Sequence, residues 1–189
     1  MKVAIFGLGY VGAVSGACFS ELGHEVVGVD VSDAKVAMIN RGEAPIVEEM
    51  IAELTAGAVQ LGKLSATKDG AAAARAADIS LVSVGTPTGR DGAPDLSYVD
   101  AVVREIGAAL RGEQKPHVVV IRSTVPPGTT QGRLAGILEE AADEKLGDRI
   151  HLAFNPEFLR EGRSVRDFRQ PPFTIIGAMS DMAFEATAI

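Results

Sequence analysis

The chain has 189 residues, 47% of them hydrophobic and 23% charged, which is enough for one sizeable apolar core. Its formal net charge of −7 and the lack of a Lys/Arg cluster argue against a nucleic-acid partner. The single cysteine, Cys18, excludes an intramolecular disulfide and a cysteine metal cluster, and we expect no metal site. No signal-peptide pattern or membrane-length apolar run is present, so we expect a cytoplasmic protein with no membrane partner.

Short β-branched runs alternate with longer segments rich in Ala, Leu and Glu, which is typical of strand-helix-strand units. The short runs lack polar alternation, as parallel strands buried on both faces do, and the expected strands are 2–6, 25–30, 63–67, 79–84, 117–121, 149–154 and 173–177. The expected helices are 11–22, 33–41, 48–61, 71–77, 96–110 and 129–142, and their candidate caps include Ser32 or Asp33 and Asp95. The sequence therefore predicts an α/β fold with a mainly parallel sheet and helices on both faces.

Three glycines, Gly7, Gly9 and Gly12, lie between the first expected strand and the first expected helix. A G-x-G-x-x-G pattern on its own could be only a tight turn that packs a helix on a strand. Here a second strand ends in Asp30, 18 residues past Gly12, which is the spacing of dinucleotide-binding units. In such units the backbone N–H groups approach a pyrophosphate and the carboxylate binds the adenosine ribose. We therefore expect a Rossmann-type, doubly wound sheet that binds a dinucleotide.

The surroundings of Asp30 favour NAD over NADP. Its carboxylate would repel a 2′-phosphate, and the following segment, DVSDAK, contains no arginine to offset that repulsion. We expect no cation to shield this carboxylate.

Loops rich in glycine and proline follow two expected strands, at 85–95 and 126–128, where open parallel sheets bind ligands. Three stretches, VGTPTGRDGAPDLSYV from 84, IRSTVPPGTT from 121 and FNPEFLREG from 154, stand out together with FGLGYVG and GVDVSDAKV. Together they resemble the nucleotide-sugar 6-dehydrogenases, the family of UDP-glucose and GDP-mannose dehydrogenases, over the whole chain. The segments GLGYVGAV and PPFTIIG are more similar to the GDP-mannose branch.

The resemblance implies an NAD-dependent enzyme that oxidises the C6 alcohol of a nucleotide sugar to a carboxylate in two steps, with GDP-mannose favoured over UDP-glucose. It implies a homodimer at full length. It implies NAD contacts, besides the glycines, at Tyr10, Val11, Asp30, Lys35, Thr86 and Thr124. It gives catalytic roles to Glu157 and Thr124, and it implies substrate contacts at Glu157, Phe158, Leu159, Arg160 and Glu161.

Glu157 also stands out from its position alone, because a carboxylate just beyond a strand's carboxyl end lies where α/β sites are built. Alternatively, Glu157 and Glu161 could pair with Arg160 and Arg163 on a solvated face. Arginines recur every three residues here, and a helix would gather them in a stripe that binds phosphates, faces solvent or faces a subunit: Arg160, Arg163, Arg166 and Arg169.

The chain departs from the family in one respect. The family's reaction passes through a thioester on a cysteine in a C-terminal segment that residues 1–189 do not contain. Cys18 lies within an expected helix, where a thiol packed among apolar residues is the natural interpretation. We therefore expect an NAD-binding domain at 1–177, the start of a truncated connecting helix at 178–189, and no activity from this chain alone.

Two alternatives stay open at this point. A non-catalytic NAD-sensing module would explain the missing nucleophile, but it would leave NPEFLREG without a role. A β-hydroxyacid dehydrogenase shares the GLGxxG opening, but it would need a glycine-rich substrate loop and a Lys-x-x-Asn helix, and we find neither.

Overall fold

The computed structural model describes residues 1–90 and 92–188. The strands of this described part form one sheet in the order β3-β2-β1-β4-β5-β6-β7. Neighbouring strands from β3 to β6 are parallel, and β7 is antiparallel to β6. The strands are β1 (Lys2–Phe6), β2 (Glu25–Val29), β3 (Leu64–Thr67), β4 (Ile79–Val82), β5 (His117–Ile121), β6 (Ile150–Phe154) and β7 (Gly177–Ala178). The order reverses between β1 and β4, which confirms the doubly wound, Rossmann-type sheet.

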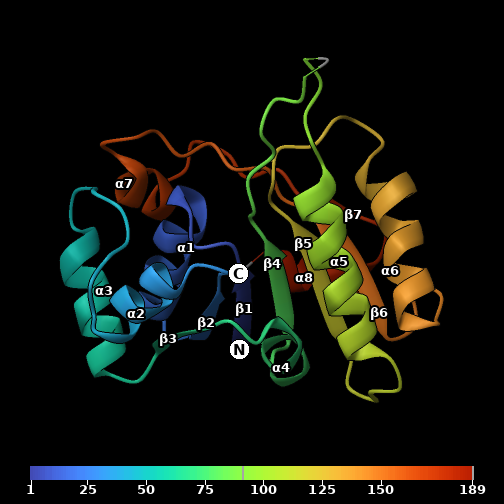
Figure 1. Cartoon of the computed structure of the whole chain (residues 1–189), viewed down its shortest axis with the longest axis horizontal. Helices are drawn as coiled ribbons and strands as arrows, with labels where there is room; N and C mark the ends of the chain where they lie inside the picture. Colours follow the sequence, from blue (N-terminus) through green and yellow to red (C-terminus); the bar gives the residue numbers. More distant parts are fainter. Residues whose placement is uncertain (91, 189) are drawn as a thin grey trace.

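Helices cover both faces of the sheet (Figure 1). One face carries α1 (Tyr10–Glu21), α2 (Asp33–Asn40), α3 (Ile51–Gln60) and α8 (Asp181–Thr187). The other face carries α4 (Gly70–Ala76), α5 (Ser97–Leu110), a π-helical turn, η1 (Thr130–Leu134), and α6 (Ala135–Ala142). The short helix α7 (Ser164–Arg169) packs against α1 through the buried Val165.

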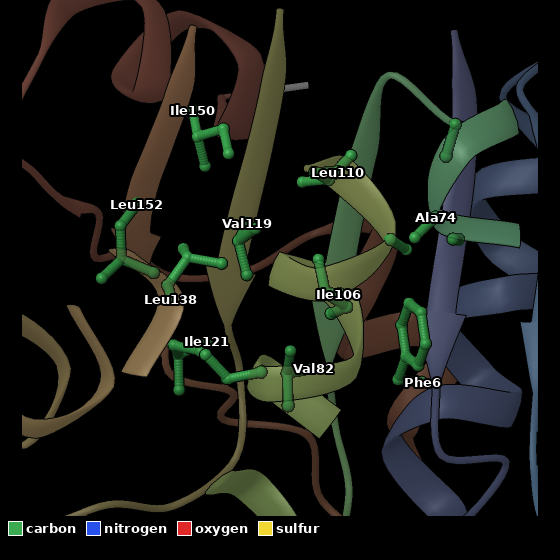
Figure 2. Packing of buried hydrophobic residues seen from close by; sticks show 14 of the residues in the cluster. Phe6, Ala74, Val82, Ile106, Leu110, Val119, Ile121, Leu138, Ile150 and Leu152 are labelled. Atoms are coloured by element: carbon green, nitrogen blue, oxygen red, sulfur yellow. The ribbon is translucent and has the colours of Figure 1, made fainter. Parts of the chain in front are cut away.

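The apolar runs are continuous because successive side chains enter two different cores. In β1, Val3 and Ile5 join the cluster under α1, while Ala4 and Phe6 join the cluster under α5. Figure 2 shows Ile106 of α5 in the second cluster, among side chains that include Phe6. A strand buried on both faces has no solvent side on which to place polar residues, so its sequence shows no alternation.

Most expected elements occur at their expected positions. The strands 2–6 and 117–121 have the expected bounds, and those at 25–30, 63–67, 79–84 and 149–154 differ by at most two residues. Ser32 is the N-cap of α2 and accepts a hydrogen bond from the Lys35 N–H. Asp95 lies one residue before the N-cap of α5, where its Oδ1 accepts a hydrogen bond from the Ser97 N–H at 2.9 Å.

The strand expected at 173–177 is wrong. Only Gly177 and Ala178 pair with β6, and the residues before them form an irregular segment in which Phe173 and Ile175 are 55% and 47% exposed. The two prolines at 171 and 172 begin this segment, and proline cannot donate to a strand ladder. The apolar run therefore looked like a strand, although only its last residue, Gly177, pairs with the edge strand β6.

Two helices begin differently from the prediction. The helix expected from residue 48 begins at Ile51, because Met50 at its N-cap has a left-handed backbone with φ 65°. The helix expected at 129–142 is η1 followed by α6, and the Leu134 N–H donates to the Thr129 carbonyl five residues back at 3.0 Å.

The segment expected to begin a connecting helix contains α8, which Ser180 caps through a hydrogen bond from the Ala183 N–H. Ala183 is fully buried against the sheet. Whether this segment connects to a further domain stays a prediction. In the described parts of the chain, every helix is too short or too polar to span a bilayer.

The packing of the core predicts how much one shortened side chain lowers the stability of the fold. Ile106 is fully buried at the centre of α5, so Ile106→Ala should lower the free energy of unfolding by about 2–5 kcal/mol through lost burial and a residual cavity. Urea unfolding followed by circular dichroism measures this. Val47 is fully exposed, and Val47→Ala should stay within about 0.5 kcal/mol of the unmutated chain. Equal effects of the two variants would contradict the assigned core.

Candidate functional site

Packing requires two of the three motif glycines. Gly7 follows β1 with φ +100°, and a Cβ there would lie 2.9 Å from the Ser83 carbonyl oxygen. A Cβ on Gly12 would lie 1.8 Å from the Gly7 carbonyl oxygen, which no small shift relieves. The tight-turn interpretation is therefore correct for these two positions, and it accounts for how closely α1 approaches β1.

Gly9 is different. A Cβ at this position would meet nothing within 4 Å, and the residue is the N-cap of α1 without any side-chain cap. The first-turn N–H groups that follow it have no acceptor inside the helix, and the first turn holds no acidic side chain. Packing does not explain this glycine, whereas an anion that approaches the helix N-terminus does.

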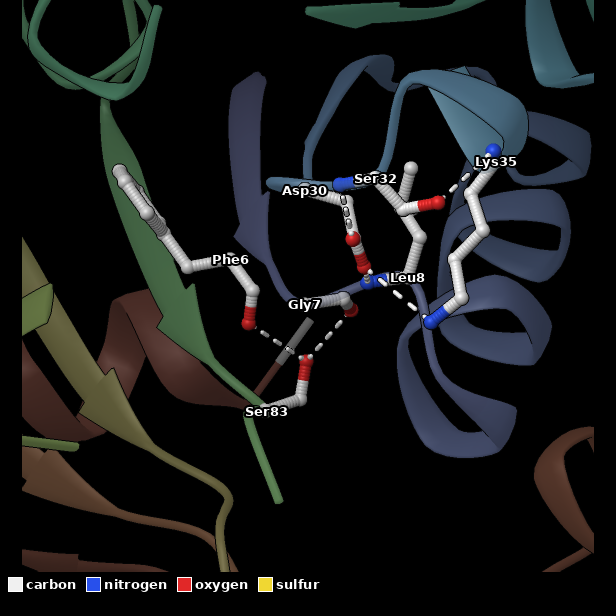
Figure 3. Close-up of polar contacts among 7 residues, drawn as sticks. All are labelled: Phe6, Gly7, Leu8, Asp30, Ser32, Lys35 and Ser83. Carbon is white, nitrogen blue, oxygen red and sulfur yellow. Dashed lines mark hydrogen bonds and ion pairs between the residues drawn. The ribbon is translucent and has the colours of Figure 1, made fainter. Parts of the chain in front are cut away.

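Ser83 holds the turn from the β4 side (Figure 3). Its N–H donates to the Phe6 carbonyl at 2.9 Å, and its hydroxyl lies 3.2 Å from the Phe6 carbonyl and 3.4 Å from the Gly7 carbonyl. Sequence reasoning missed this residue. The available signal was a small polar residue directly after the buried strand that pairs with the glycine strand.

Asp30 lies at the end of β2, and its side chain is 10% exposed. One carboxylate oxygen accepts the Leu8 N–H at 2.8 Å and the other accepts the Ser32 N–H at 2.9 Å (Figure 3). The Lys35 ammonium lies 3.4 Å from Oδ2. The expectation that no cation shields Asp30 is therefore wrong. Because Ser32 caps α2, this helix begins shortly after β2 ends. Its first turn therefore places the Lys35 side chain beside the Asp30 carboxylate.

A cleft of about 520 Å³ opens at this point, within the size range of small-ligand sites. We call it the Asp30 cleft. It lies where the strand order reverses, the position at which doubly wound sheets bind their ligands. Its lining comes from the carboxyl ends of β1, β2, β3 and β4 and from α2 and α5: Phe6, Gly7, Gly9, Val29, Asp30, Val31, Lys35, Lys68, Ser83, Val84, Gly85, Tyr98, Ala101, Val102 and Glu105.

A second cavity, of about 190 Å³, lies beyond β6, and we call it the Glu157 pocket. Glu157 is half-buried there and accepts the Leu159 N–H at 2.7 Å. The rings of Phe158 and Phe173 meet edge to face at 5.0 Å, which joins this loop to the irregular segment before β7. Residues that directly follow the carboxyl ends of strands line both cavities: those after β1, β2 and β4 line the Asp30 cleft, and those after β5 and β6 line the Glu157 pocket. These strand ends point upward in Figure 1.

Arg122, which directly follows β5, also lines the Glu157 pocket, and sequence reasoning missed it. Its guanidinium donates to Asn155, and the Asn155 amide donates to the Ile175 carbonyl at 2.8 Å. Burial lowers the pKa of Arg122, and the negative charge of Glu157 opposes that shift. Its Nε is buried without a hydrogen-bond partner among the described residues. The signal for this residue was an arginine directly after the buried strand HVVVI.

Arg160 does not pair with the neighbouring glutamates. Its Nε and Nη2 donate to Asp167 at 2.9 and 2.7 Å, and its backbone N–H donates to the same carboxylate at 3.1 Å. Hydrogen bonds from the Arg160 side chain, which outweigh desolvation, lower the pKa of Asp167 to about 2. Arg169 pairs with Glu21, so two arginines of the expected stripe already have carboxylate partners within the chain. α7 spans only 164–169, so Arg160 lies outside any helical stripe.

The other predicted residues occupy different places. The Tyr10 hydroxyl donates to Glu48, away from the Asp30 cleft. Thr86 is half-buried after β4, Thr124 is exposed after β5, and neither lines the Asp30 cleft or the Glu157 pocket. Thus the structure groups Gly7, Gly9, Asp30 and Lys35 in one cavity and Glu157, Phe158 and Leu159 in the other.

Cys18 is buried in α1 among apolar side chains, as expected. Burial raises the pKa of its thiol to about 12. A thiol with so high a pKa holds almost no thiolate near neutral pH, so Cys18 is not an activated nucleophile.

Comparisons with known proteins agree with this geometry. The model of the UDP-glucose/GDP-mannose dehydrogenase family, NAD binding domain, matches residues 1–188. GDP-mannose 6-dehydrogenase of Pseudomonas syringae pv. syringae is 48% identical over 177 residues, covering 94% of this chain and 40% of that protein. UDP-glucose 6-dehydrogenase of Haloferax volcanii is 40% identical over 191 residues, covering 100% of this chain and 43% of that protein.

Among solved structures, the ternary complex of GDP-mannose dehydrogenase from Pseudomonas aeruginosa superposes with a TM-score of 0.97 at 43% identity. The match covers 99% of this chain and 43% of that chain. The UDP-glucose dehydrogenase of Pyrobaculum islandicum gives 0.92 at 40% identity, over 98% of this chain and 42% of that one. The chain therefore spans about 40% of the length of the curated relatives it matches.

Fold and site together define a dinucleotide-binding Rossmann domain: a doubly wound sheet, a glycine turn at its switch point and an acidic residue at the next strand end. The family match narrows this class. The chain belongs to the UDP-glucose/GDP-mannose dehydrogenase family of NAD-dependent oxidoreductases, as its NAD-binding domain. The β-hydroxyacid dehydrogenase interpretation is accordingly dropped.

The open space around Gly9 predicts a variant that separates binding from folding. Gly9→Val should leave the circular dichroism spectrum near normal but abolish measurable NAD binding, because the added side chain would occupy the approach to the α1 N–H groups. Titration calorimetry measures the affinity. Gly57→Val, at a helical glycine that also faces open space, is the control and should bind NAD normally. Unchanged NAD binding by Gly9→Val would leave the turn as a packing device only.

Proposed function

We propose that this chain is the cofactor-binding part of a nucleotide-sugar 6-dehydrogenase, which oxidises a C6 alcohol to a carboxylate in two NAD-dependent steps. The observation that carries the proposal is the family match over residues 1–188 on a chain with both cavities at one end of the sheet. GDP-mannose is the favoured substrate, since GDP-mannose 6-dehydrogenases are 45–48% identical to this chain and UDP-glucose 6-dehydrogenases are 40–43% identical.

The Asp30 cleft supports a defined placement of NAD. The pyrophosphate would lie at Gly9 against the N–H groups of Tyr10, Val11 and Gly12, and Gly7 would shape the turn beneath it. Asp30 would accept hydrogen bonds from the adenosine ribose, with Lys35 beside it. We propose that Thr86 and Thr124, in the loops after β4 and β5, contact the part of NAD beyond the pyrophosphate.

The Glu157 pocket supports the roles proposed at the reacting carbon. Bound NAD would supply the hydride acceptor. We propose that Glu157 orients and deprotonates the water that releases the acyl group, and that Thr124 holds that water or the substrate oxygen. Substrate contacts are proposed at Phe158, Leu159, Arg160 and Glu161. Asp167 holds both the guanidinium and the backbone N–H of Arg160, so a substrate contact by Arg160 would require these hydrogen bonds to rearrange.

Several properties of the longer protein remain proposals: the homodimer, the cytoplasmic location, the boundary between 1–177 and 178–189, and the inactivity of this chain alone. The last follows from chemistry. A thioester route needs a thiolate, and the pKa of Cys18 is raised to about 12. The NAD-sensing alternative would leave the Glu157 pocket without a purpose.

We predict that the chain binds NAD more tightly than NADP, because a 2′-phosphate would lie beside the Asp30 carboxylate. Lys35 offsets only part of this repulsion, since its ammonium is 3.4 Å from one oxygen that also accepts the Leu8 N–H. Asp30→Asn should weaken NAD binding about tenfold or more through loss of a charged acceptor.

Titration calorimetry with both cofactors tests this preference. The control is Asp148→Asn, which removes an exposed carboxylate before the amino end of β6, and it should bind both cofactors normally. Equal affinity for NAD and NADP in the unmutated chain would refute the assignment to Asp30.

For catalysis, we predict that residues 1–189 bind NAD but form no NADH with GDP-mannose or UDP-glucose. A chain extended to the length of its relatives should form NADH, and Glu157→Gln in that chain should lower kcat by about 10² to 10⁴, the usual range for a positioned acid–base group. Absorbance at the NADH band measures both.

Cys18→Ser in either chain is the control, and its rates should equal those of the unmutated protein because the thiol is buried. NADH production by residues 1–189 that disappears in Cys18→Ser would overturn the division of roles. Full activity of the extended Glu157→Gln enzyme would remove only the role of Glu157.

A further inference from the structure

Three distant segments meet at the carboxylate of Glu48, which lies in the loop between α2 and α3. The Tyr10 hydroxyl, from the first turn of α1, donates to Glu48 Oε2. The Gly162 N–H, which ends the segment 157–162, donates to the same oxygen at 2.8 Å. The Tyr10 hydroxyl also lies 3.4 Å from the Arg160 carbonyl. Glu48 therefore bridges the glycine turn and the 157–162 loop.

The hydrogen bonds that Glu48 accepts go to an ionised carboxylate, which makes this bridge strong. Partial desolvation of Glu48 by itself raises the pKa of its carboxyl, but hydrogen bonds from Tyr10 and from the Gly162 and Glu49 N–H groups lower that pKa overall. Hydrogen bonds to an ionised acceptor are roughly twice as strong as neutral ones. Gly162 has φ +81°, a conformation that side chains rarely adopt, and this turn brings its N–H to Glu48.

The 157–162 loop has a second anchor, but that anchor belongs to its own neighbourhood. Asp167 of α7 holds the backbone and side chain of Arg160, only seven residues away in sequence. Glu48 is 114 residues from Gly162, and of the two carboxylate anchors it is the one that also contacts α1, the helix whose N-terminus would receive the cofactor. Leu159 adds an apolar contact to the same helix.

We propose that Glu48 is a positioning residue that, through Tyr10, couples NAD binding at the glycine turn to the order of the 157–162 loop. The inference rests on the proposed function, since it takes NAD as the occupant of the turn and 157–162 as the nucleotide-sugar loop. An anion at Gly9 fixes the first turn of α1, that turn holds the Tyr10 side chain, and Tyr10 with Glu48 holds Gly162. Such coupling is reciprocal, so an ordered loop also favours NAD binding.

Hydrogen exchange of the 157–162 loop, with and without saturating NAD, tests the coupling in the 189-residue chain. In the unmutated protein, NAD should slow exchange of this loop by about 5- to 150-fold, the usual range of coupling between two sites. In Glu48→Gln and in Tyr10→Phe, each saturated with NAD, the slowing should disappear. Glu49→Gln, a variant of the exposed neighbour, should behave as the unmutated chain does.

NAD affinity, measured by calorimetry, and a double variant distinguish coupling from a structural brace, that is, a contact that stabilises the loop equally with and without NAD. Because coupling is reciprocal, Glu48→Gln should weaken NAD binding by about the factor by which NAD slows loop exchange in the unmutated chain. The double variant Tyr10→Phe/Glu48→Gln should lose no more coupling than either single variant, since the two residues act in series.

Three outcomes would overturn the proposal. Variants that bind NAD and retain the full NAD-dependent slowing would overturn it and leave the proposed function intact. So would faster loop exchange in Glu48→Gln with an unchanged ratio between the NAD-bound and free states, because that result describes a brace without coupling. Failure of the folded, unmutated chain to bind NAD would overturn the proposed function as well.

Discussion

The close contact between the Gly7 carbonyl and Gly12 sets the position of everything at the carboxyl end of the sheet. Without a Cβ on Gly12, α1 starts directly against the end of β1, and Ser83 fixes the same turn from β4. The N-terminus of α1 consequently opens into the gap where the strand order reverses. A helix displaced by even one methyl group at this point would carry its free N–H groups, and the hydroxyl of Tyr10, away from their positions.

Packing accounts for Gly7 and Gly12, whereas the proposed cofactor contact falls on Gly9. In Asp30, a structural role and the proposed ribose contact fall on one side chain. Its oxygens accept the Leu8 and Ser32 N–H groups, so the carboxylate helps to hold the glycine turn before any ligand arrives. The nearby ammonium of Lys35 stabilises a negative charge that is only 10% exposed. A carboxylate fixed in this way loses little conformational freedom when it accepts a ribose hydroxyl, which is the physical advantage of a preorganised site.

The sequence predicted best what depends on neighbours along the chain. The strands at 2–6 and 117–121 were correct because burial on both faces leaves an unbroken apolar run. The strand at 173–177 failed because Phe173 and Ile175 are apolar without being buried. Arg122, Ser83 and Glu48 were missed because their partners are 33, 77 and 114 residues away. Lys35 was placed at the cofactor site by resemblance, but its approach to Asp30 depends on the helix cap, which the local sequence only suggests.

The loop 157–162 shows how partners within the chain change the meaning of a motif. From the sequence alone, the segment NPEFLREG offers a ligand two carboxylates, Glu157 and Glu161, and one guanidinium, Arg160. In the fold, Asp167 neutralises Arg160, and Glu48 accepts the N–H of Gly162. Glu157 lines the pocket, and its negative charge acts on the guanidinium of Arg122, which directly follows the neighbouring strand β5. Since Asp167 pairs with Arg160, Glu157 and Arg122 are the ionisable side chains of this pocket that stay outside an ion pair among the described residues. The Leu159 N–H, from the same motif, holds the Glu157 carboxylate in place.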